Sequence, residues 1–392
     1  MMFRGMPGVP LLLVLLTAGG FAVEGGAASP GLTVQDGRLM KDGQPFRGVG
    51  ANYYDLFLRV LRDRADESTL RGLARLSRAG IPFVRFAGPF SAREWNQFFE
   101  HQEEYFLRMD RVVRAAEKEN VGLIPSMFWT LNLCETVGET RDQWGAPESK
   151  TLDRMRRYVA AVVNRYARSP AIWAWEFGNE LNLKADLPNA ARFRPPGGTA
   201  RDDVKSQHVV MALREFAAEV RRRDSWRPIF SGNSHPRSCA WHNSFENSWK
   251  ADSREQFRQM VLRDNPEPLD TIGVHLYADN GAQKELGTWA TNFVQWQTEL
   301  KRIATEAGRP VFIGEFGLAS KGDERATRAA FEGLLAGMEE CGIDLAAFWV
   351  YDNPRQEGSW NVTADNKRGY MIEVSAEANR RWLARARSRA NQ

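Results

Sequence analysis

Eight short apolar stretches recur along the chain, and each is followed by a segment with helical periodicity. Composition stays even between them, and no low-complexity linker or internal sequence repeat interrupts the alternation. Eight strand–helix units in one unbroken series predict an α/β fold, a single-domain (β/α)8 TIM barrel. The expected strands are 46–52, 83–86, 121–128, 172–177, 228–231, 271–277, 311–316 and 346–351.

Several of the expected helices end on residues that stop helices. Gly80, Gly308 and Gly342, and the Asn120-Val121-Gly122 run, each stand directly before the next strand. A doubly wound open sheet is the alternative fold, but Gly48-Val49-Gly50 lacks the third glycine of a dinucleotide-binding loop. The expected helices are 67–79, 103–119, 151–167, 203–223, 255–263, 289–307, 323–340 and 376–387.

The first 28 residues predict a secretory signal peptide that is not part of the fold. Arg4 precedes an apolar run at 9–16, and small residues follow up to Ser29. That run is shorter than the roughly 20 apolar residues of a membrane-spanning helix, as is every later one. We therefore expect residues 29–392 to form the catalytic domain of a secreted protein, extracellular or periplasmic, with no membrane association. A leader retained in the membrane is the alternative.

After the leader, two short strands at 32–34 and 38–40 flank an Asp36-Gly37 turn. This pattern predicts an N-terminal β-hairpin ahead of the barrel.

Charge and metal-binding motifs exclude several functions. The 53 Lys and Arg residues exceed the 49 Asp and Glu residues by four and are interleaved with them, so no nucleic-acid surface is expected. The cysteines form no C-x-x-C pair and the histidines no H-E-x-x-H, so we expect neither a metal nor another cofactor. In an exported chain Cys134 and Cys239 are the better candidates for a disulfide, and three free cysteines are the alternative. We expect a monomer.

A barrel of this kind places its chemistry at the carboxyl ends of its strands. Two strands deliver a carboxylate there: the stretch 172–177 runs into Asn179-Glu180, and the stretch 311–316 carries Glu315. Two carboxylates facing each other across a barrel mouth predict acid/base and nucleophilic work on a polar substrate. Glu176, four residues before Glu180, is expected to lie deeper in the barrel as a structural carboxylate.

The ordered set Arg85, Asn179-Glu180, His275-x-Tyr277, Glu315 and Trp349 resembles glycoside hydrolase family 5, the cellulase and β-mannanase superfamily. The resemblance covers nearly the whole mature chain. It implies a retaining, endo-acting β-glycosidase of the endo-β-1,4-mannanase or endo-β-1,4-glucanase type. Such an enzyme cleaves β-1,4-linked mannan, glucomannan or glucan, or oligosaccharides of these, by double displacement, with Glu180 as acid/base and Glu315 as nucleophile.

Two positions depart from the family pattern. Family 5 cellulases commonly carry a His after the third strand and a Pro after the catalytic Asn-Glu, whereas this chain has Trp129 and its neighbours, and Leu181. The first departure favours mannan over glucan as substrate.

The residues expected to bind substrate or to support the carboxylates are the polar and aromatic ones at the strand ends. Arg85 and Tyr277 can donate to Glu315 and keep it ionised. His275 can orient Glu180 or the substrate, and the Trp349 ring can stack on a sugar. The expected set is Asn52, Arg85, Trp129, Asn179, His275, Tyr277 and Trp349.

Other activities stay open at this point. A barrel that binds glycans without cleaving them would normally have lost one of Glu180 and Glu315, and both are present. Sugar transfer shares the same intermediate as hydrolysis. Exo-action is possible because the Pro- and Gly-rich insertion 182–199 could wall off one end of the cleft.

Overall fold

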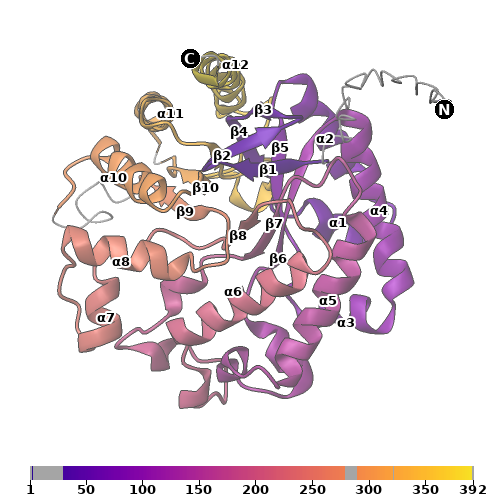
Figure 1. Cartoon of the computed structure of the whole chain (residues 1–392), viewed down its shortest axis with the longest axis vertical. Helices are drawn as coiled ribbons and strands as arrows, with labels where there is room; N and C mark the ends of the chain where they lie inside the picture. Colours follow the sequence, from indigo (N-terminus) through magenta and orange to yellow (C-terminus); the bar gives the residue numbers. More distant parts are fainter. Residues whose placement is uncertain (1, 3–29, 279–288, 321, 391–392) are drawn as a thin grey trace.

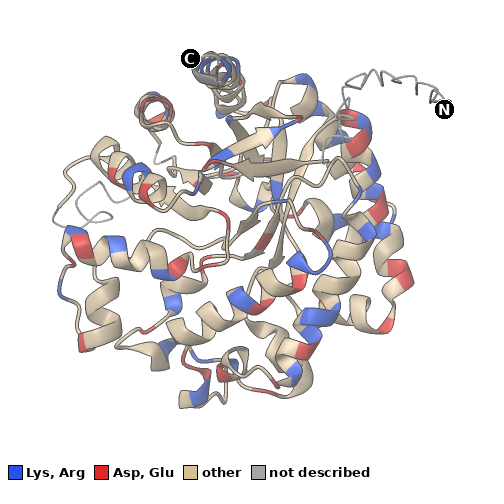
Figure 2. Cartoon of the chain, viewed as in Figure 1, with Lys and Arg blue, Asp and Glu red and all other residues tan. Residues whose placement is uncertain are grey.

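A computed structural model describes residues 2, 30–278, 289–320 and 322–390 (Figure 1). The leader expected over residues 1–28 lies, apart from Met2, outside these residues. Among the helices that the structure describes, none is long and apolar enough to cross a membrane. Acidic and basic residues are interspersed along the outer helices, as the interleaved sequence predicts (Figure 2).

The core of the molecule is an eight-stranded parallel sheet that curls into a barrel, in the order β8-β7-β6-β5-β4-β11-β10-β9. Strands and helices alternate along the chain, so the predicted (β/α)8 barrel is confirmed. Its strands are β4 (Gly48–Asn52), β5 (Phe83–Ala87), β6 (Gly122–Phe128), β7 (Trp175–Gly178), β8 (Ile229–Phe230), β9 (Ile272–Tyr277), β10 (Val311–Gly317) and β11 (Leu345–Phe348).

Hydrogen bonds from side chains and loops close the barrel between its end strands β8 and β9. The Asp270 carboxylate accepts from the Ile229 N–H at 2.8 Å, and the Thr271 hydroxyl donates to the Ile229 carbonyl at 3.3 Å. Beyond β8, the His235 N–H donates to the His275 carbonyl at 3.3 Å. The short strand β8 is therefore held against β9 without a regular ladder.

Helices surround the barrel (Figure 1). The predicted stops at Asn120 and Gly342 are confirmed, because both residues take left-handed backbone angles, φ 53° and 78°. The helices α1, α3 and α7 were not expected from the sequence. The described helices are α1 (Leu56–Arg62), α2 (Ser68–Arg78), α3 (Ala92–Glu100), α4 (Gln102–Glu119), α5 (Lys150–Tyr166), α6 (Ser206–Arg221), α7 (Ala240–Glu246), α8 (Arg254–Asp264), α10 (Phe293–Glu306), α11 (Glu324–Cys341) and α12 (Tyr370–Ala390).

The predicted N-terminal hairpin is confirmed and extended by a third short strand. β1 (Leu32–Gln35) pairs with β2 (Arg38–Lys41), which pairs with β3 (Gln44–Pro45), all antiparallel. Leu32 and Leu39 pack with Phe83, Trp173 and Phe312 at the amino ends of the barrel strands. The hairpin thus plugs one end of the barrel and leaves the carboxyl ends open to solvent.

No disulfide joins Cys134 to Cys239, and all three cysteines are free. Cys134 lies in the main hydrophobic core, where its thiol donates to the Leu131 carbonyl at 3.1 Å, whereas Cys239 lines the cleft described below. Burial raises the pKa of Cys134 to about 12 and keeps it a thiol.

Candidate active site

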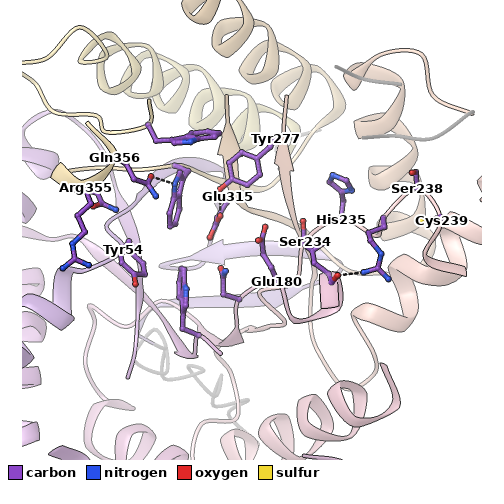
Figure 3. Close-up of a pocket in the computed structure, with 17 residues that line it drawn as sticks. Tyr54, Glu180, Ser234, His235, Ser238, Cys239, Tyr277, Glu315, Arg355 and Gln356 are labelled. Carbon is purple, nitrogen blue, oxygen red and sulfur yellow. Dashed lines mark hydrogen bonds between the residues drawn. The ribbon is translucent and has the colours of Figure 1, made fainter. Parts of the chain in front are cut away.

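A cleft of about 770 Å³ opens at the carboxyl ends of the barrel strands (Figure 3). It holds both expected carboxylates, Glu180 and Glu315, and its walls come from the loops that follow β4, β6, β7, β8 and β11. The lining residues are Tyr54, Trp129, Asn179, Glu180, Leu183, Ser234, His235, Arg237, Ser238, Cys239, Tyr277, Glu315, Trp349, Asn353, Arg355, Gln356 and Trp360.

Glu315 is held by a donor on each of its carboxylate oxygens. The Arg85 Nη1 donates to Oε1 at 2.6 Å, and the Tyr277 hydroxyl donates to Oε2. Burial raises the pKa of Tyr277 well above its ordinary value, and Glu315 adds to that shift, so the phenol stays protonated as a donor. Both contacts are the ones expected from the sequence.

Arg85 is itself fully buried and serves several acceptors at once. Its Nε donates to Glu176 at 2.6 Å, its Nη1 to the Asn52 amide oxygen at 3.0 Å, and its Nη2 to the Asn179 amide oxygen at 2.9 Å. The expectation that Glu176 is a structural carboxylate is confirmed, because its side chain has no exposed surface and pairs with Arg85. The guanidinium fixes the amide of Asn179 so that its NH₂ group is free to face the cleft.

Glu180 follows β7 in a left-handed backbone conformation, φ 52°, which is strained for a non-glycine residue. Its N–H donates to the Gly232 carbonyl at 2.8 Å. Gly232 has a φ of +71°, and a Cβ there would come within 1.9 Å of the Gly178 carbonyl oxygen. The loops after β7 and β8 therefore meet at a contact that only glycine permits, and this contact aims the Glu180 side chain into the cleft.

His275 lies beneath the two carboxylates. Its Nδ1 is 3.0 Å from Glu180 Oε1 and 3.6 Å from Glu315 Oε2, and the three side chains each offer an atom within 4.8 Å of the others. Burial lowers the pKa of His275 to about 3, so the ring is neutral at working pH. A neutral ring leaves Glu180 free to keep its proton, whereas an imidazolium would stabilise its carboxylate.

Burial also raises the pKa of Glu180 above its ordinary value, although Arg85 opposes the shift. The same cleft thus holds one carboxyl group that favours the protonated form and one carboxylate with a guanidinium at 2.6 Å. The cluster of Glu180, His275 and Glu315 has the composition of a metal site. However, both Glu315 oxygens already accept hydrogen bonds and the Arg85 charge would repel a cation, so the arrangement fits proton transfer and nucleophilic attack better.

Three aromatic rings form one wall of the cleft. Trp129 and Trp349 are stacked with centroids 6.3 Å apart, and Tyr54 lies 5.1 Å from Trp129 and 5.9 Å from Trp349. The Trp349 Nε1–H donates to the Gln356 side-chain oxygen at 2.9 Å, which fixes the orientation of the ring. Such a wall can stack on the C–H faces of a sugar.

The structure separates the expected site residues into two groups. Trp129, Asn179, Glu180, Tyr277, Glu315 and Trp349 line the cleft, as expected. Asn52, Arg85 and His275 have no exposed surface and lie below it, so they contact the carboxylates and their neighbours instead of the substrate space. The sequence did not identify Tyr54, Arg237, Asn353, Arg355, Gln356 and Trp360; of these only Tyr54 stood at a predicted strand end.

The family model described as "Cellulase (glycosyl hydrolase family 5)" matches residues 47–354. Mannan endo-1,4-beta-mannosidase A of Podospora anserina is 27% identical over 182 residues, which is 41% of this chain and 48% of the relative. Mannan endo-1,4-beta-mannosidase F of Aspergillus fumigatus is 23% identical over 341 residues, 81% of this chain and 69% of the relative. The chain thus matches about half the length of the first relative.

Among solved structures, the endo-1,4-beta-mannanase from Rhizomucor miehei superposes with a TM-score of 0.65 and 16% sequence identity. The match covers 91% of this chain and 99% of that one. At this identity the likeness shows the barrel fold.

Proposed function

Because the chain belongs to glycosyl hydrolase family 5, we propose that it is a secreted, retaining hydrolase that cleaves β-1,4-linked mannan or glucomannan within the chain. One observation carries the mechanism: Glu180 and Glu315 bring oxygens within 4.8 Å of each other in one cleft. The names of the curated relatives favour mannan over glucan. Residues 1–28 act as the export signal and residues 29–392 as the catalytic domain.

In the first step Glu315 attacks the anomeric carbon of the bound sugar. The bond from that carbon to the glycosidic oxygen breaks as Glu180 gives its proton to the leaving oxygen. An ester between the sugar and Glu315 results, and the shortened glycan leaves with a new hydroxyl group. Burial raises the pKa of Glu180, which favours the protonated form that this step needs.

In the second step Glu180, now a carboxylate, takes a proton from a water molecule. The water oxygen attacks the anomeric carbon from the face that the leaving group vacated, and the ester bond breaks to return Glu315 as a carboxylate. Two inversions leave the product in the β-configuration. The close approach of the two carboxylates supports this route, because inverting enzymes keep theirs about 6.5–9.5 Å apart to admit a water.

The positive charge of Arg85 has a carboxylate partner through both steps. When Glu315 becomes a neutral ester, the guanidinium remains paired with Glu176 at 2.6 Å. A lone buried cation would be costly. Burial raises the pKa of Glu176, but the Arg85 charge opposes that shift, so Glu176 is the partner that can balance the guanidinium while Glu315 is esterified.

The cleft walls provide the substrate contacts in this proposal. The free NH₂ group of Asn179 donates to the hydroxyl at C2 of the sugar under attack, and Trp349 stacks beneath its ring.

A hydrolysis screen of the purified protein on mannan, glucomannan, carboxymethyl-cellulose, xylan and aryl β-glycosides tests the proposal, with Glu315→Ala as the inactive control. We expect mannan and glucomannan to yield β-1,4-linked oligosaccharides of mixed length. If only single mannose units are released, the enzyme acts from the chain end, and the proposal of internal cleavage is wrong. Faster cleavage of carboxymethyl-cellulose than of mannan would overturn the substrate. No cleavage of any glycan, together with binding, would favour a silent glycan-binding barrel.

A further inference from the structure

A second group of aromatic side chains lies outside the cleft, on and just after α7. After Met2, Phe245 and Trp249 are the most exposed large apolar side chains among the described residues, with 64% and 54% of their surfaces accessible. Trp241, half-buried, packs on Phe245 with ring centroids 4.9 Å apart. Scattered apolar side chains on a surface are ordinary, but here an aromatic pair on α7 is followed four residues later by a third exposed ring, Trp249. A concentration of exposed aromatic residues of this kind can mark a binding site.

The patch continues from the wall of the cleft. Arg237 and Cys239 line the cleft, and Cys239 is the N-cap residue directly before α7. The Arg237 Nε donates to the Asn243 side chain within α7 at 3.0 Å. Its Nη1 donates to the carbonyls of Asn182 and Leu183, at 2.9 and 2.6 Å, two and three residues after Glu180. One guanidinium therefore ties the helix of the patch to the loop of the candidate acid.

The patch is held on a rigid support. The Asp252 carboxylate accepts from the Trp241 N–H at 2.8 Å, from the His242 N–H at 3.2 Å, and pairs with the His242 ring at 2.7 Å. The Asn243 amide donates to the Ser248 carbonyl at 2.8 Å and fixes the turn that leads to Trp249. Aromatic rings on a fixed base can stack on a ligand with little loss of conformational entropy.

The position of α7 relative to the carboxylates indicates which part of a glycan would reach it. Figure 3 shows Tyr54, Arg355 and Gln356 on one side of Glu315 and Glu180, and Ser234, His235, Ser238 and Cys239 on the other. The acid protonates the oxygen of the leaving sugar, so the Glu180 side of the cleft holds the leaving part of the chain. Cys239 on that side is the N-cap of α7, so the helix that carries Trp241 and Phe245 starts from there.

Charge indicates a neutral ligand. The seven residues of α7 contain a single charged side chain, Glu246, and Figure 2 shows the helix almost without charge. Around the rings, Asp186, Lys205 and Glu246 share a hollow with Phe245, and Lys250 follows Trp249, so two acidic and two basic residues balance each other. Flat aromatic faces in surroundings without a net charge suit sugar rings that carry no charge.

We propose that Trp241, Phe245 and Trp249 form a binding surface for a neutral β-linked polysaccharide, which runs out of the cleft past Cys239 on the leaving-group side. The inference rests on the proposed function, because that function assigns Glu180 as the acid. A second copy of this chain is the competing occupant of the patch.

The test combines Phe245→Ala with Trp249→Ala in one variant, since both side chains are exposed and their loss should leave the fold intact. Leu107→Ala on α4, 45% exposed, is the matched control. Binding is measured by retardation in native gels that contain mannan or glucomannan, in the Glu315→Ala background so that no glycan is consumed. Stacking energies predict a loss of affinity of about two- to tenfold for the double variant.

The same pair of substitutions in the active protein should lower kcat/KM on polymeric mannan by a similar factor and leave kcat/KM on a short aryl β-glycoside unchanged. Retardation equal to that of Leu107→Ala would overturn the surface, even if mannan is hydrolysed. If the protein cleaves none of the glycans but its retardation depends on Phe245 and Trp249, the surface stands and the proposed function fails. A dimer in sedimentation that the double variant dissociates, with glycan binding unchanged, would assign the patch to a second copy and overturn the proposal.

Discussion

Arg85 and Glu176 form an ion pair in which neither side chain has exposed surface, with the Nε of the guanidinium 2.6 Å from the Glu176 carboxylate. The same guanidinium lies 2.6 Å from Glu315 through its Nη1. One cation is therefore shared between a structural carboxylate and the candidate nucleophile. Removing the structural partner should leave the whole charge of Arg85 acting on Glu315.

Glu176→Gln should slow formation of the glycosyl-enzyme at least tenfold. Arg85 would then hold Glu315 as its only counter-ion, which stabilises the carboxylate and opposes its conversion to an ester. The free energy of unfolding should fall by up to about 3 kcal/mol, because a buried pair is broken. Single-turnover kinetics with an activated aryl glycoside and denaturant unfolding measure the two effects.

Glu215→Gln is the control for this variant, since it breaks the partly exposed pair with Arg156 on the outer surface. It should change the unfolding free energy by less than about 1 kcal/mol and leave the rate unchanged. If Glu176→Gln forms the glycosyl-enzyme as fast as the unsubstituted protein, the charge of Arg85 needs no second carboxylate partner.

Glu315→Ala should abolish turnover without unfolding the barrel. The substitution leaves space beside the anomeric carbon, so azide should restore cleavage of an activated aryl glycoside and yield a glycosyl azide. Product analysis by mass spectrometry checks the rescue, with circular dichroism as the control for folding. Near-normal activity without azide would end the assignment of Glu315 as nucleophile.

The barrel itself could be predicted from the sequence. The apolar stretches of its strands and the Gly and Asn stops of its helices are local signals, and the expected elements match the observed ones to within a few residues at most ends. The sequence did not predict the helices α1, α3 and α7, because a helix of seven to nine residues has too few turns to show a hydrophobic periodicity.

The two carboxylates could also be predicted, because a strand's carboxyl end is a position in the sequence. The sequence could not predict, however, which of the residues at the strand ends reach the cleft. Asn52 and Arg85 stand at strand ends but point into the barrel interior, where Arg85 donates hydrogen bonds to both Glu176 and Glu315. The wall residues Gln356 and Trp360 lie on a loop whose path depends on tertiary contacts, such as the bond from Trp349 to Gln356.

Glu180→Ala should lose far more rate on substrates with poor leaving groups than on activated ones. A leaving group of low pKa departs without a proton, whereas an alkoxide needs the acid. Comparing kcat/KM for a dinitrophenyl β-glycoside and for a mannan oligosaccharide measures the difference. Equal losses on both substrates would argue against the acid role.

Glu180→Gln should raise the thermal stability of the inactive protein at neutral pH. Burial raises the pKa of Glu180 in the folded state, so the folded protein binds more protons than the unfolded one and stability falls as pH rises from the unfolded pKa to the folded pKa. A Gln side chain does not ionise, so its burial carries no cost that grows with pH. Scanning calorimetry should show a gain in Tm of about 1–3 °C at pH 7 that disappears below about pH 4, where Glu180 is protonated in both states. A gain independent of pH would point to relief of a different strain.

The stereochemistry of the product tests the double displacement directly. In the proposed route Glu315 attacks the anomeric carbon itself, and the approach of Glu180 and Glu315 oxygens to within 4.8 Å of each other supports this route over direct attack by water. A slow fluorinated glycoside should then leave a sugar ester on Glu315 that mass spectrometry can locate. Proton NMR of the first-formed product should show the β-anomer before mutarotation. An initial α-anomer would require the water to attack directly, and the assigned roles of both carboxylates would fail together.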